Sequence, residues 1–89
     1  MTKILVVEDD RQIQQELVLL LQRNGFEAQA LTSFESASQQ IIAAHPDLVL
    51  LDLNLPGIDG QQICREVRQL SNVPIIVVTS RNTDLDELM

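Results

Sequence analysis

At 89 residues, the chain has room for no more than one small domain with an economical hydrophobic core. Its 13 acidic and 6 basic residues give a formal net charge of -7, which disfavours direct binding to nucleic acid or to an anionic membrane surface and favours binding of a cation. No apolar run approaches the length of a membrane span, no signal peptide pattern opens the chain, and the single Cys64 cannot form an internal disulfide, so we expect a cytoplasmic location.

A buried strand and an amphipathic helix are predicted at the start of the chain. Residues 3–7 form a short apolar run, and the acids Glu8, Asp9 and Asp10 follow it at once. Apolar residues then recur at helical spacing as far as Gly25. Of the three acids, Asp10 lies nearest to this helix, and we expect it to cap the amino end.

A second strand and helix follow. Residues 26–31 alternate apolar and polar side chains, which suits a strand near the edge of a sheet. Ser33 is the expected N-cap of a helix that runs to about Ala44 and ends at His45 and Pro46. The chain therefore alternates strand and helix from its beginning.

The central strand is the most apolar stretch. Residues 48–51 do not alternate with polar ones, which predicts a strand covered on both faces, as in a parallel sheet flanked by helices. Asp52 stands at its carboxyl end, where ligands collect in open parallel sheets. Pro56 and Gly57 suit the two central positions of a type II turn.

The last predicted elements repeat the alternation. Asp59 can cap a helix over residues 60–70, and residues 73–78 are a further apolar strand. This strand delivers Thr79 to the same sheet edge as Asp52, and Thr83 with the acids after it predicts the opening of a fourth helix. The predicted architecture is α/β.

Several acids should meet at one edge of this sheet. If the strands are parallel, the acids after the first strand, Asp52 and Thr79 all emerge together. Clustered carboxylates repel, and Mg²⁺, which prefers oxygen ligands, would relieve the repulsion. A carboxylate beside such a metal is a plausible nucleophile toward a phosphoryl group.

Three motifs resemble the receiver domain of bacterial two-component response regulators. They are Ile-Leu-Val-Val-Glu-Asp-Asp at 4–10, Leu-Asp-Leu-Asn-Leu-Pro-Gly-Ile-Asp-Gly at 51–60, and Val-Pro-Ile-Ile-Val-Val-Thr-Ser at 73–80. The resemblance covers essentially the whole chain. It implies a flavodoxin-like (CheY-like), doubly wound parallel sheet, here with about four strands and three to four helices. It also implies a module that accepts phosphate from a sensor histidine kinase and is not itself an enzyme.

The resemblance assigns a role to each matching residue. Asp52 would be the phosphoacceptor and a ligand of Mg²⁺. Glu8 and Asp9 would be the acidic pair, with Asp9 on the metal directly and Glu8 through water. The backbone carbonyl of Asn54 would be a further metal ligand, and the Thr79 hydroxyl would sense the phosphoryl group.

The chain departs from the family pattern at its carboxyl end. A complete fourth helix, a fifth strand ending in a lysine, and a fifth helix are not found, so residues 1–89 resemble an incomplete receiver domain. The single Lys3 lies at the wrong end of the sheet, and Arg81 is a poor positional match. The fourth strand would then be an exposed apolar edge, so we expect self-association through residues 74–78 or through a swapped element.

Two other functions compete with the phosphoacceptor. A receiver that no longer takes phosphate could serve as a dimerisation or docking module, and it would show no Mg²⁺-dependent reactivity at Asp52. A Mg²⁺-dependent phosphohydrolase usually carries a second aspartate two residues after its nucleophile, and Asn54 occupies that position here. A transcriptional role would need an output domain, because this segment offers no DNA contact of its own.

Overall fold

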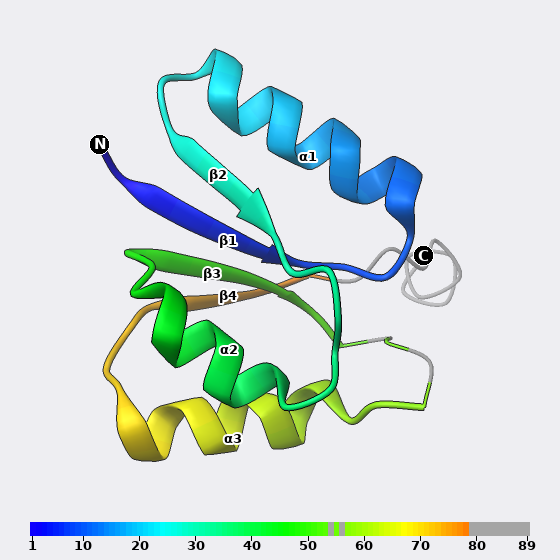
Figure 1. Ribbon diagram of the computed structural model, residues 1–89, viewed down its shortest axis with the longest axis vertical. Helices are drawn as coiled ribbons and strands as arrows, with labels where there is room; N and C mark the ends of the chain where they lie inside the picture. Colours follow the sequence, from blue (N-terminus) through cyan, green and yellow to red (C-terminus); the bar gives the residue numbers. More distant parts are fainter. Residues whose placement is uncertain (54, 56, 79–89) are drawn as a thin grey trace, which may run out of the picture.

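The computed structural model describes residues 1–53, 55 and 57–78, which form an α/β unit (Figure 1). Four parallel strands make one sheet in the order β2-β1-β3-β4. The elements are β1 (Lys3–Val7), α1 (Arg11–Arg23), β2 (Glu27–Ala30), α2 (Ala37–Ala44), β3 (Leu48–Asp52), α3 (Gly60–Leu70) and β4 (Ile75–Val78). The predicted CheY-like, doubly wound sheet is confirmed.

Some predictions fall on residues outside this described part. They are the turn at Pro56, the carbonyl ligand of Asn54, the hydroxyl of Thr79, the loop at Arg81 and the helix opening at Thr83.

The helices lie on both faces of the sheet. In Figure 1, α1 covers one face, while α2 and α3 lie together on the other. Parallel strands require such crossover connections, because after each strand the chain must return to the amino end of the sheet before the next strand begins. All carboxyl ends therefore lie at one edge. No described helix is long and apolar enough to cross a membrane.

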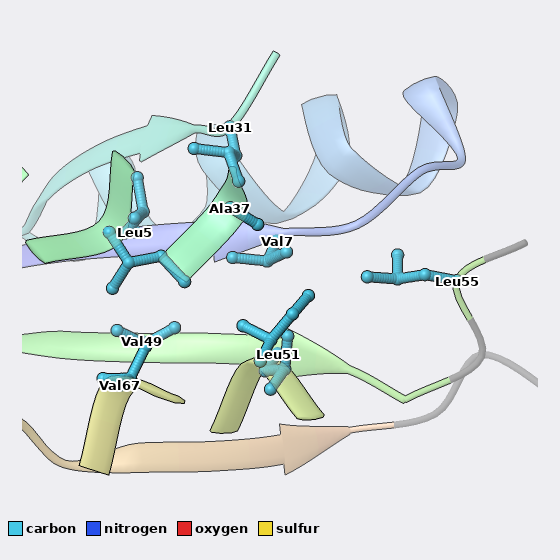
Figure 2. Packing of buried hydrophobic residues seen from close by; sticks show 10 residues of the cluster. Leu5, Val7, Leu31, Ala37, Val49, Leu51, Leu55 and Val67 are labelled. Carbon is cyan, nitrogen blue, oxygen red and sulfur yellow. The ribbon is translucent and has the colours of Figure 1, made fainter. Parts of the chain in front are cut away.

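The main core lies between the sheet and the pair α2 and α3. Alternate side chains of β1 and β3 point into it and meet side chains from both helices (Figure 2). The fully buried members include Val7, Val49, Leu51 and Val67. This packing fixes β3, the strand that ends at Asp52, in the middle of the sheet.

The opposite face is covered less completely than the sequence predicts. Ile4 and Val6 of β1 are buried, but Leu48 and Leu50 of β3 are only half-buried, because α1 packs mainly on β2 and β1. On β4, Ile75 packs against the main core, whereas about half of Ile76 and of Val77 is exposed. The prediction that residues 48–51 are covered on both faces was therefore only half right.

Two of the three predicted helix caps are present. The Asp10 carboxylate accepts hydrogen bonds from the backbone N–H groups of Gln12 (2.9 Å) and Ile13 (3.2 Å) at the start of α1. The Asp59 carboxylate accepts from the N–H of Gln61 (2.9 Å) at the start of α3. Each cap satisfies donors that the first helical turn leaves unpaired.

The predicted cap at Ser33 was wrong. The helix begins at Ala37 and follows Ser36, which has a left-handed backbone (φ 54) and makes no capping side-chain hydrogen bond in the described structure. The amide of Gln40 donates instead to the carbonyls of Ser33 and Glu35. A side chain from inside the helix thus holds the preceding residues in a turn, and the helix starts three residues later than expected.

The fourth strand also begins later than predicted, at Ile75 and not at Val73. The Val73 carbonyl accepts a hydrogen bond from the guanidinium of Arg68, and Pro74 has no N–H to donate to a ladder. The register with β3 therefore begins at Ile75, and the Pro74 carbonyl takes part by accepting a hydrogen bond from the Val49 N–H (2.9 Å).

Candidate functional site

Three of the predicted acids meet at the carboxyl edge of the sheet. Val7 pairs with Leu51 in the parallel register, so Glu8 and Asp52 come next on neighbouring strands. Ligand oxygens of Glu8, Asp9 and Asp52 all lie within 4.8 Å of one another. Glu8 is only 3% exposed and Asp52 is 0% exposed, so two carboxyl groups are buried side by side.

Burial perturbs the protonation of this pair. Loss of hydration, together with a hydrogen bond to Asp52 and the negative charge of that residue, raises the pKa of Glu8 from 4.5 to about 8. The backbone N–H of Asp10, 3.4 Å from the Glu8 carboxylate, opposes the rise. In the absence of a metal, this environment therefore favours the protonated form of Glu8.

The donor set fits a hard divalent cation. Mg²⁺ takes oxygen ligands, commonly one or two carboxylates together with waters, and three carboxyl groups converge here. A cation between them would replace the proton that the buried pair now needs. Glu8, Asp9 and Asp52 are the described residues that would hold it.

The turn after Asp52 is held closely against α3. A Cβ atom on Gly60 would lie 2.9 Å from the Leu53 Cα and 3.1 Å from the Asp52 carbonyl oxygen, so only glycine allows this approach. Gly57 has a φ of 68, the left-handed conformation expected of it from the sequence. The two glycines shape the segment that follows the buried aspartate.

We expect Gly60→Ala to destabilise the fold by about 1–3 kcal/mol, because both nearest atoms belong to the backbone and must shift to admit a methyl group. Urea unfolding followed by circular dichroism measures the change. Gln61→Ala, at the exposed next position, is the control and should cost no more than about 0.5 kcal/mol. Equal free energies of unfolding for the two variants would show that the backbone of the turn can shift to admit the methyl group at no cost.

One residue at this edge was missed by the sequence analysis. Gln14 is half-buried on α1, and its amide donates hydrogen bonds to the carbonyls of Glu8 and Leu31. The sequence does contain an indication of this role. Gln14 lies on the same inward face of the helix as Leu17 and Leu21, and a polar residue on an otherwise apolar face suggests a buried hydrogen bond. The pocket beside the acids is lined by Glu8, Asp9, Arg11, Gln14, Leu31, Thr32 and Phe34.

The sequence matches a known family over nearly its whole length. The model of the response regulator receiver domain matches residues 4–88. The sensory transduction protein RegX3 of Mycobacterium tuberculosis is 40% identical over 89 residues, which is 100% of this chain and 39% of the relative. The chain thus spans about two fifths of the length of the curated relatives that it matches.

Solved structures agree with the sequence match. The N-terminal domain of the nisin resistance regulator NsrR is 35% identical, with a TM-score of 0.83 over 92% of this chain and 69% of that one. The response regulator TrrA of Thermotoga maritima, solved in complex with Mg²⁺-BeF, is 32% identical, with a TM-score of 0.81 over 99% of this chain and 77% of that one.

TrrA has also been solved in complex with the histidine kinase ThkA. That structure is 34% identical, with a TM-score of 0.79 over 90% of this chain and 70% of that one. The family match, the parallel sheet and the acidic cluster at its carboxyl edge agree with one another. The chain belongs to the response regulator receiver domain family.

Proposed function

We propose that this chain is a phosphoacceptor module in which Asp52 takes a phosphoryl group from a sensor histidine kinase with the help of Mg²⁺. The observation that carries the proposal is the fully buried Asp52 beside Glu8 and Asp9, with oxygens of all three within 4.8 Å. Relatives support it, because TrrA has been solved both with Mg²⁺-BeF and with a histidine kinase. We place the reaction in the cytoplasm, where an unpaired Cys64 stays reduced.

The proposed transfer is a displacement at phosphorus. An oxygen of the Asp52 carboxylate attacks the phosphorus of a phosphohistidine, a P–O bond forms, and the P–N bond breaks with its electron pair returning to the imidazole. When bound, Mg²⁺ supplies positive charge to the phosphoryl oxygens during the transfer. Glu8 and Asp9 would hold the ion, and the burial of Asp52 keeps its carboxylate in one place between two strands.

Two further residues complete the proposal. The backbone carbonyl of Asn54 would bind the metal, and the Thr79 hydroxyl would sense the bound phosphoryl group. Both assignments come from the family pattern. With them, residues 1–89 would act as one receiver unit.

The proposal is tested by intact mass after incubation with acetyl phosphate and Mg²⁺. We expect one phosphoryl group on the wild type, none on Asp52→Asn, and none when the metal is removed by a chelator. Asp59→Asn is the matched control, because Asp59 lies at the same sheet edge, is exposed, and asparagine still caps a helix. It should be phosphorylated like the wild type.

The same samples distinguish the second candidate, a docking module that takes no phosphate. Its supporting observation is β4, where about half of Ile76 and of Val77 is exposed at a sheet edge. A folded chain that takes no phosphate and runs as a dimer in light scattering would favour docking. A phosphorylated chain that remains a monomer would exclude it.

A further inference from the structure

We propose that Gln14 is a positioning residue that holds the acid-bearing turn of Glu8 and Asp9 in the geometry that Mg²⁺ requires. The inference rests on the proposed function, and it concerns a residue that none of the sequence motifs includes. It is carried by the pattern of hydrogen bonds that the Gln14 side chain makes at the carboxyl edge of the sheet.

The amide of Gln14 joins two segments that are distant in sequence. Its Nε2 lies 3.0 Å from the carbonyl oxygen of Glu8 and 3.2 Å from that of Leu31. A primary amide carries two N–H donors, so both are used. The side chain therefore connects the turn between β1 and α1 to the end of β2.

The second segment is a firm anchor. Leu31 is 6% exposed, belongs to the main core, and donates its backbone N–H to the carbonyl of Val6 at 2.9 Å. Through Gln14, the Glu8 carbonyl is therefore fixed relative to β1 and β2. A turn tied in this way cannot rotate without breaking a hydrogen bond to the sheet.

The first contact bears directly on the acids. The carbonyl that Gln14 holds belongs to the peptide unit between Glu8 and Asp9. Because that unit is planar, fixing its C=O direction fixes the direction of the chain at both Cα atoms. Partners that orient ligand residues in this way change metal affinity without touching the metal.

The chain contains a natural comparison in Gln40. Its amide also donates two hydrogen bonds to backbone carbonyls, those of Ser33 (3.2 Å) and Glu35 (2.7 Å). Neither of these residues belongs to the acidic cluster. Loss of either glutamine amide removes the same number of hydrogen bonds, but only loss of the Gln14 amide releases the turn that carries metal ligands.

The test compares Gln14→Met with Gln40→Met, since methionine is similar in length and has no donors. Titration calorimetry with MgCl₂ should give a roughly tenfold weaker Kd for Gln14→Met and a Kd within about twofold of wild type for Gln40→Met. In the metal-free chain, amide hydrogen exchange of Asp9 and Asp10 should accelerate in Gln14→Met alone.

The outcomes separate this inference from the proposed function. A wild type that binds no Mg²⁺ would defeat both. Unchanged affinity in Gln14→Met, or equal losses in the two variants, would overturn the positioning role and leave the metal site standing. If Gln14→Met does not fold, Gln14→Asn replaces it; its amide is one methylene too short to reach both carbonyls, so wild-type affinity there would equally overturn the role.

Discussion

Without metal, the folded chain should lose stability as the pH rises from about 5 to about 9, by up to about 1.4 kcal/mol per pH unit. The cause is Glu8, whose pKa is raised from 4.5 to about 8 by burial beside Asp52. Between these values the native state holds a proton that the unfolded chain has released. Stability is therefore full below pH 4.5 and is lost as the pH rises through about 8.

Urea unfolding in the presence of a chelator, repeated across this pH range, measures the effect. Glu8→Gln is the control, because its side chain is neutral at every pH and its stability should change much less. A wild-type profile as flat as that of Glu8→Gln would show that the two carboxyl groups do not share a dehydrated site.

Adding Mg²⁺ should reverse the trend. In the proposed site the ion would bind the ionised form of Glu8, so it would compete with the proton, and its binding would release that proton. The gain in stability from a fixed Mg²⁺ concentration should therefore be larger at about pH 9 than at about pH 5. A gain that is equal at both values would place the ion away from Glu8.

The sheet and the acidic edge could be predicted because they depend on local patterns and on one topological rule. Apolar runs separated by helical periods identified the strands, and parallel strands bring their carboxyl ends to one edge. Glu8 and Asp52 each follow such a run directly. The proximity of Glu8 and Asp52 could therefore be predicted without knowing how side chains pack. The roles assigned to Asn54 and Thr79 stay predictions.

Details that depend on distant contacts could not be predicted in the same way. Serine is a favoured residue type at helix N-caps, but the Gln40 amide donates a hydrogen bond to the Ser33 carbonyl, and the helix begins later in the chain. Gln14 binds a carbonyl 17 residues away, and no local pattern encodes that partner. The exposure of Val77 likewise depends on which helices reach β4, whereas its apolar run is typical of a buried strand.

Leu51→Ala should destabilise the chain by about 2–5 kcal/mol, a large part of the stability of so small a domain. Leu51 is 0% exposed and belongs to the core cluster that also holds Val7, Val49 and Val67 (Figure 2). Truncation removes apolar contacts and leaves a cavity that a close-packed sheet and helix cannot fill. Urea denaturation measures the loss in the free energy of unfolding, with the same dependence on urea concentration assumed for both proteins.

Leu50→Ala is the matched control, because it removes the same atoms from the same strand on the opposite, half-covered face. At low protein concentration it should cost about half as much as Leu51→Ala, since less apolar area returns to water. A cost that rises with protein concentration would mean that a second copy covers this face, which is a different surface from the edge strand through which the sequence predicts self-association. A cost equal to that of Leu51→Ala at every concentration would contradict the half-covered face, because the chain itself would then bury Leu50 completely.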